Sequence, residues 1–118
     1  MFEAHDIREW RGHPVRGADG GKIGEMEAVY VDTRTDVPSF ATVKAGVPGR
    51  KRLVFVPLDG ASVSPGYVTV AYDKGQVKGA PSIGTDGELA FEEEPAVYSH
   101  YELDYEPGAA GERRLARR

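Results

Sequence analysis

Apolar residues along this chain occur in short runs separated by turn-forming residues. The turn signals recur at intervals of roughly 5 to 15 residues and are Asp19-Gly20-Gly21, Asp32 to Asp36, Pro48-Gly49, Asp59-Gly60 and Ser64-Pro65-Gly66. β-Branched and aromatic residues fill the stretches between them, which is the composition of half-buried strands. The pattern predicts strands near residues 13–17, 22–32, 37–46, 52–58, 61–64 and 67–72.

Two of these strands have distinctive patterns. Apolar side chains in residues 23–32 do not keep one parity, which predicts a bulge near Gly24 or Ala28. Leu53 to Leu58 is continuously apolar, which predicts a strand covered on both faces, by a barrel interior and by a helix or a partner subunit. Pro57 cannot donate to a ladder, so we expect a strand end or a sheet edge there.

The two ends of the chain show other patterns. Residues 5–11 fit one helical turn, with Ile7 and Trp10 facing the core. Residues 91–101 fit a helix that has acids near its start and Pro95 in its first turn. Residues 108–118 are small, polar and basic, which predicts disorder. We therefore expect one domain at residues 1–106 and a flexible basic tail at 107–118.

Length and composition place the chain among ordinary globular proteins. It has 118 residues, 40% of them hydrophobic and 29% charged, which suits one domain. It has no cysteine, which excludes a disulfide framework and a thiolate nucleophile. No apolar run approaches the roughly 18 residues of a membrane span, and residues 1–6 lack the pattern of a secretory signal. We expect a cytoplasmic protein without a transmembrane segment.

Charge is distributed unevenly along the chain. The formal net charge of -4 argues against general nucleic-acid binding. Residues 109–118 hold four Arg and one Glu, a balance of +3, so residues 1–108 carry -7. Glu92 to Glu106 contains six acids and no Lys or Arg. An acidic surface and a basic tail are consistent with self-association, with a partner patch or with solubility alone.

No catalytic, cofactor-binding or metal site emerges from the sequence. His5, His13 and His100 show no metal-ligand spacing. The five serines lack the Gly-x-Ser-x-Gly setting of a nucleophile elbow. The glycines of residues 20–24 lack the Gly-Lys-Ser/Thr ending of a phosphate loop, and hairpin-turn chemistry explains them better. We expect a protein that is not an enzyme and needs no cofactor.

Three groups of residues are candidates for interaction. Arg50, Lys51 and Arg52, with Lys44 nearby, form a compact basic cluster at a predicted hairpin tip, where they are either solvated or contact RNA or an acidic partner. The apolar strand contributes Leu53 and Phe55. The last helix contributes Tyr98 and Tyr101, which pack either on their own barrel or against another subunit.

The chain resembles the PRC-barrel family. Members open with "Gly-x-x-Val", continue with a turn like "Asp-Gly-x-Lys-Ile-Gly" and then a strand like "Val-x-x-Val-x-Val-Asp". Here these stand as Gly12-His13-Pro14-Val15, Asp19-Gly20-Gly21-Lys22-Ile23-Gly24 and the strand that ends at Asp32. The later motifs are Val56-Pro57, Tyr72-Asp73-Lys74 and Val77-Lys78-Gly79-Ala80-Pro81.

The resemblance implies a mainly β fold, a small six-stranded antiparallel barrel with a short N-terminal helical turn and a C-terminal helix. Relatives of this type act as interaction or assembly modules. They include the cytoplasmic domain of the photosynthetic reaction-centre H subunit and the C-terminal domain of the ribosome-maturation factor RimM, which contacts a ribosomal protein. The chain looks closest to stand-alone bacterial forms, many of which carry a second, stress-associated domain.

We therefore expect a non-catalytic protein–protein interaction module that forms a homodimer and binds a protein partner that the sequence does not identify. The alternative is an RNA- or ribosome-associated factor that uses Arg50, Lys51, Arg52 and the Arg-rich tail. A photosynthetic or electron-transport role would rest on fold analogy alone.

Overall fold

The computed structural model describes residues 10–85 and 87–117, and within them the chain builds one mixed sheet of eight strands. The strands are β1 (Pro14–Arg16), β2 (Lys22–Asp32), β3 (Val37–Ala45), β4 (Arg52–Pro57), β5 (Ser62–Ser64), β6 (Tyr67–Thr69), β7 (Ser82–Ile83) and β8 (Leu115–Arg117). The helices are α2 (Lys74–Lys78), η2 (Phe91–Glu93) and α3 (Glu94–His100).

The sheet is open and mixed, which corrects the prediction of a six-stranded antiparallel barrel. Its strands follow the order β5-β6-β1-β2-β3-β4-β7, with β8 added to β2. The pairs are antiparallel except β1 with β6, which is parallel. The six predicted strands are all present. The two additional ones, β7 and β8, have two and three residues, too few to show an alternating pattern.

Both faces of the central strands are buried. Along β4, Val54 and Val56 enter a first core with residues of β1, β2, β3 and β6, whereas Phe55 enters a second core with Tyr98 and Tyr101. This alternation follows the two-residue period of a strand. The predicted double coverage of residues 53–58 is confirmed, and the cover on the second face is α3 of the same chain rather than a partner subunit.

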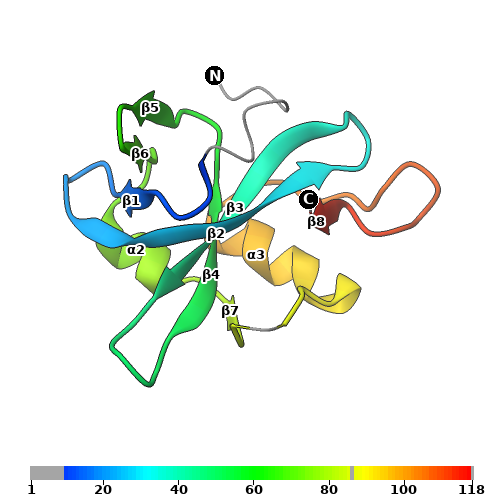
Figure 1. Ribbon diagram of the computed structural model, residues 1–118. Coiled ribbons are helices and arrows are strands. Elements are labelled where there is room, and N and C mark those ends of the chain that lie inside the picture. Colours follow the sequence, from blue (N-terminus) through cyan, green and yellow to red (C-terminus); the bar gives the residue numbers. More distant parts are fainter. Residues whose placement is uncertain (1–9, 86, 118) are drawn as a thin grey trace.

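The helices lie against this sheet (Figure 1). The predicted helix at residues 91–101 is confirmed as η2 followed by α3, with Pro95 in the first turn of α3. Helix α2 places Val77 in the first core. Trp10 is buried in that core too, and the rest of the predicted turn at residues 5–11, except Arg11, falls outside the described residues. Among the described residues, no helix is both long and apolar enough to cross a bilayer.

Strand β2 is irregular near Gly24 and Ala28, as its pattern predicted. The register with β3 shifts between Met26 and Ala28, so Glu27 is the extra residue of a bulge. At Gly24 the carbonyl oxygen of Lys44 lies 2.0 Å from where a Cβ atom would stand. Only glycine therefore allows the backbones of β2 and β3 to approach this closely.

The segment expected to be a flexible tail is folded against the domain through residue 117. Strand β8 pairs antiparallel with β2, matching Leu115 with Asp32, Ala116 with Val31 and Arg117 with Tyr30. Figure 1 shows β8, in red, beside the cyan end of β2. The Leu115 side chain is completely buried. The prediction of flexibility is therefore wrong for this segment, because one leucine and three ion pairs dock a stretch whose composition alone indicates disorder.

Candidate functional site

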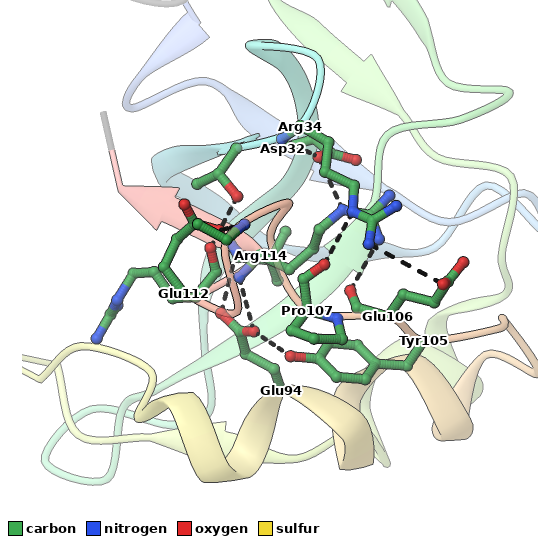
Figure 2. Close-up of polar contacts among 12 residues, drawn as sticks. Asp32, Arg34, Glu94, Tyr105, Glu106, Pro107, Glu112 and Arg114 are labelled. Carbon is green, nitrogen blue, oxygen red and sulfur yellow. Dashed lines mark hydrogen bonds and ion pairs between the residues drawn. The ribbon is translucent and has the colours of Figure 1, made fainter.

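The C-terminal segment is held by a buried carboxylate, that of Glu94. The Tyr105 hydroxyl donates to Glu94 Oε1 over 2.6 Å, the Arg114 amide donates to the same oxygen over 2.9 Å, and the Leu115 amide donates to Oε2 over 3.0 Å. Figure 2 shows the side chain rising from α3 toward the segment. We call Glu94, Tyr105 and the amides of Arg114 and Leu115 the tail latch.

The position of Glu94 in the chain explains why a carboxylate can be buried there. It is the first residue of α3 and lies near the beginning of the continuous η2–α3 helical stretch, the end of a helix that favours negative charge. Its neighbours Glu92 and Glu93 are exposed, whereas Glu94 is fully buried. Burial of a carboxylate is unfavourable unless donors satisfy it, and the three donors of the tail latch do so.

Arg114 forms the second attachment of the segment. Its Nε atom donates to Asp32 Oδ1 over 2.7 Å, and its Nη1 atom donates to the Glu106 carbonyl over 2.9 Å. The Arg34 amide also donates to Asp32 Oδ1, over 2.7 Å. Burial of Asp32 raises its pKa, but these hydrogen bonds offset that effect, and the pKa lies below its ordinary value of 3.8.

Arg117 forms the third attachment. Its two terminal nitrogens donate to the two carboxylate oxygens of Glu27 over 2.8 and 2.6 Å, a bidentate pair. The buried Thr42 hydroxyl donates to Glu27 Oε1 over 2.7 Å. Burial raises the pKa of Glu27, but the bonds from Arg117 and Thr42 bring the pKa below its ordinary value of 4.5. The bulge in β2 thus aims Glu27 at the C-terminal segment.

Leu115 supplies the apolar part of the attachment. Its side chain lies in the second core, together with Tyr30 and Val97. The Thr33 amide and hydroxyl donate to the carbonyls of Arg114 and Arg113 over 2.8 and 2.7 Å, which continues the pairing of β2 past its end. We call the site formed by the edge of β2, Glu27, Asp32 and Glu94 the tail groove.

Four of the predicted interaction residues belong to the core of the protein. Leu53 and Phe55 have no exposed surface, and Tyr98 and Tyr101 are 5% and 4% exposed. The Tyr101 hydroxyl donates to the Phe55 carbonyl over 2.5 Å, which joins α3 to β4. All four candidate interaction residues therefore lie in the core of the domain rather than on its exposed surface. Of the two alternatives for the tyrosines, packing on their own domain is confirmed.

The basic cluster does lie on the surface. Arg50, Lys51 and Arg52 are exposed at the tip of the hairpin that joins β3 to β4, and Lys44 is exposed on β3. Among the described residues, none of these four cations forms an ion pair. Arg50 and Arg52 also border a depression of about 140 Å³, which Lys78 lines as well. We call Lys44, Arg50, Lys51 and Arg52 the basic tip.

Other polar groups on the surface are dispersed. A depression of about 440 Å³ lies between the β2–β3 and β4–β5 turns, and its charged residues are Asp32, already bound to Arg114, and Asp59. His100 lies at the end of α3, where its Nε2 atom is 2.7 Å from the Gln76 carbonyl. His13 precedes β1, and His5 falls outside the described residues. In the described part of the chain, no three potential ligands gather as a metal site.

The sequence alone does not mark Glu27, Asp32, Glu94 and Leu115 as a group. One signal was present, an isolated leucine between arginines in residues 113–117 of an otherwise small and polar stretch. The unequal charge of the tail and the body was a second signal, and the structure places arginines of the tail on acids of the body. Neither signal identifies the edge of β2 as the docking site.

Replacing Glu94 with Gln tests the tail latch. The amide keeps one acceptor and turns an N–H donor toward backbone N–H donors, so we expect the free energy of unfolding to fall by about 2 kcal/mol. Urea unfolding followed by the fluorescence of Trp10, the only tryptophan, measures this. The control is Glu93→Gln at the exposed neighbouring position, with an expected change below about 0.5 kcal/mol. Equal effects of the two substitutions would contradict the latch.

Replacing Asp32 with Asn tests the ion pair with Arg114 through its dependence on pH. A carboxylate whose pKa is lowered in the folded state stabilises that state above its unfolded pKa, and the contribution disappears as the pH falls through the folded pKa. We expect the stability difference between wild type and Asp32→Asn to be largest near neutral pH and to shrink below about pH 5. Asp59→Asn, on an exposed turn, is the control. A difference that stays constant with pH would be the contrary result.

Comparison with known proteins gives a family match for the first part of the chain. No curated protein matches this chain. A family model described as PRC-barrel domain matches residues 2–77, the part that contains β1 to β6 and most of α2. Because this match covers more than half of the chain, the protein belongs to the PRC-barrel family.

Proposed function

We propose that this protein is a non-catalytic interaction module that binds an acidic surface of a partner protein through the basic tip. The observation that supports the proposal is the group of four exposed cations Lys44, Arg50, Lys51 and Arg52, which have no ion pair within the described residues. A body of net negative charge that presents such a group at one end favours oriented binding of an acidic partner.

The hairpin below the basic tip suits this role. Strands β3 and β4 pair over six consecutive residues, from Phe40 with Pro57 to Ala45 with Arg52. Both strands are anchored by buried side chains, so the tip extends from a rigid base. The depression beside Arg50, Arg52 and Lys78 offers a concave place for one or two carboxylates. The guanidinium groups of Arg50 and Arg52 suit such carboxylates, because a guanidinium can donate two hydrogen bonds to the two oxygens of one carboxylate.

Binding of RNA or a ribosomal partner by the same basic tip is the alternative. Phosphates and carboxylates are both anions, so the charge of the tip suits either. Two features weigh against RNA. Arg113, Arg114 and Arg117 of the C-terminal segment already pair with acids of the body, and the neighbouring aromatic ring, Phe55, is buried and offers no stacking surface.

The variant Arg50→Ala/Lys51→Ala/Arg52→Ala tests the proposal. We expect the variant to capture at least tenfold less of the proteins that the wild type captures from an extract of its source cell, because the basic tip loses three positive charges that attract their acidic surfaces. The control Arg16→Ala/Lys22→Ala/Lys74→Ala removes as many cations from β1, β2 and α2 and should keep the captured set.

Nuclease treatment and salt separate the two candidates. Capture that survives nuclease supports a protein partner, whereas capture that disappears with nuclease, together with steeply salt-dependent binding of an RNA oligonucleotide, supports RNA. Equal capture by the wild type, the triple variant and the control would contradict a role for the basic tip in either function.

A further inference from the structure

The tail groove binds an extended peptide, and the peptide it holds is the C-terminal segment of the same chain. Its components are those of peptide recognition by strand addition, in which main-chain pairing supplies affinity and pockets for alternate side chains supply specificity. The main chain of β8 pairs with Tyr30, Val31 and Asp32. Leu115 fills the apolar pocket, and Arg114 and Arg117 meet Asp32 and Glu27.

All of these contacts join residues far apart in the sequence. Asp32 and Arg114 are 82 residues apart, and Glu27 and Arg117 are 90 residues apart. None of them requires the two sides to belong to one chain, so the same segment of a second copy satisfies the groove equally well. The groove also needs an occupant. Without one, the edge of β2 is open and the buried carboxylate of Glu94 loses two of its three donors.

The connection before the segment has the features of a hinge. Residues 108–111, Gly-Ala-Ala-Gly, form a tight turn. Two hydrogen bonds of 2.8 Å close it: the Gly111 amide donates to the Gly108 carbonyl, and the Gly108 amide donates to the Glu112 carbonyl. Ahead of the turn, the Arg34 side chain holds the Pro107 carbonyl over 2.8 Å. Opening the turn therefore releases residues 112–117, while the bond from Arg34 still holds the chain at Pro107.

We propose that the tail groove is a strand-exchange site, in which β8 of one copy occupies the groove of a second copy and the second copy reciprocates. A second copy is the occupant of matching chemistry, because it carries the same leucine between the same arginines, and its positive segment suits the negative groove. The exchange is isologous and closes on itself as a two-fold dimer. The tail groove is formed by other residues than the basic tip, so this proposal stands independently of the partner proposed above.

The length of the turn controls the balance between the monomer, whose segment occupies its own groove, and the strand-exchanged dimer. In the native chain the short connection gives the segment an effective concentration of about millimolar at its own groove, so at micromolar protein the monomer predominates. A connection too short to form the turn cannot return the segment to its own groove. The same connection still reaches a second copy in an extended form.

Deletion of Ala109 and Ala110 tests the proposal in the full chain. We expect light scattering at about 100 μM to give twice the mass of one chain, a concentration well above typical micromolar affinity. The control is Ala109→Gly/Ala110→Gly, which keeps the length of the turn and should remain monomeric as the wild type does. A monomeric deletion variant would overturn the proposal.

Disulfide trapping shows which surface joins the copies, and it serves if the deletion variant fails to fold. The chain has no cysteine, so Val31→Cys in one copy and Ala116→Cys in another can form only an intermolecular bond, and these two positions are paired between β2 and β8. The two variants keep the native turn and are mixed at about 1 mM protein in a glutathione buffer. The control mixture pairs Val31→Cys with Val63→Cys, which lies on the exposed edge strand β5. We expect several-fold more of the disulfide between Val31→Cys and Ala116→Cys than of the control disulfide. No excess over the control, or a dimeric deletion variant without this bond, would overturn strand exchange.

Discussion

The fold depends on covering a sheet that is apolar on both of its faces. Strands β2, β3 and β4 direct alternate residues into two cores, and each buried aliphatic or aromatic side chain contributes about 1.5–3 kcal/mol relative to exposure. The curl of the sheet and α2 enclose the first core. The second requires a separate cover, which α3 and Leu115 provide. Without α3 and Leu115, the second face of the sheet would be exposed to water.

The tail latch is the point at which this cover is completed. Glu94 begins α3 and reaches the amides that begin β8, so one carboxylate fixes both the helix and the strand that lie on the second face. The ion pairs of Arg114 and Arg117 add orientation more than stability, since partly exposed pairs contribute modestly. Burial of Leu115 and the satisfied carboxylate carry most of the attachment.

Much of the fold could be predicted from the sequence. The turn residues and the β-branched runs located six strands, the broken parity of β2 revealed its bulge, and the continuous apolar run at residues 53–58 predicted coverage on both faces. The cover itself could not be predicted. An apolar strand face has no mark that distinguishes a helix of its own chain from a partner, and for this reason the sequence leaves Phe55 and Tyr98 as candidates for a contact surface although they pack in one core.

The C-terminal segment was mispredicted for a related reason. Local composition reports whether a stretch can build a core by itself, and residues 108–117 cannot. Its order comes from one leucine, two hydrogen-bonded amides and arginines whose partners lie 82 and 90 residues away. Such distant complementarity has no local signature. By contrast, the basic tip could be placed on the surface from sequence because a hairpin turn and its flanking charges are local features.

Native-state hydrogen exchange at the amides of Arg114 and Leu115 tests the central claim, that the C-terminal segment is an integral strand fastened by Glu94. These amides donate to a buried carboxylate, so we predict strong protection, although less than that of central amides in β3, because the segment can open at its own turn without global unfolding. Their exchange should remain many times slower than that of an unstructured peptide. Exchange at the rate of an unstructured peptide, while β3 stays protected, would contradict the account.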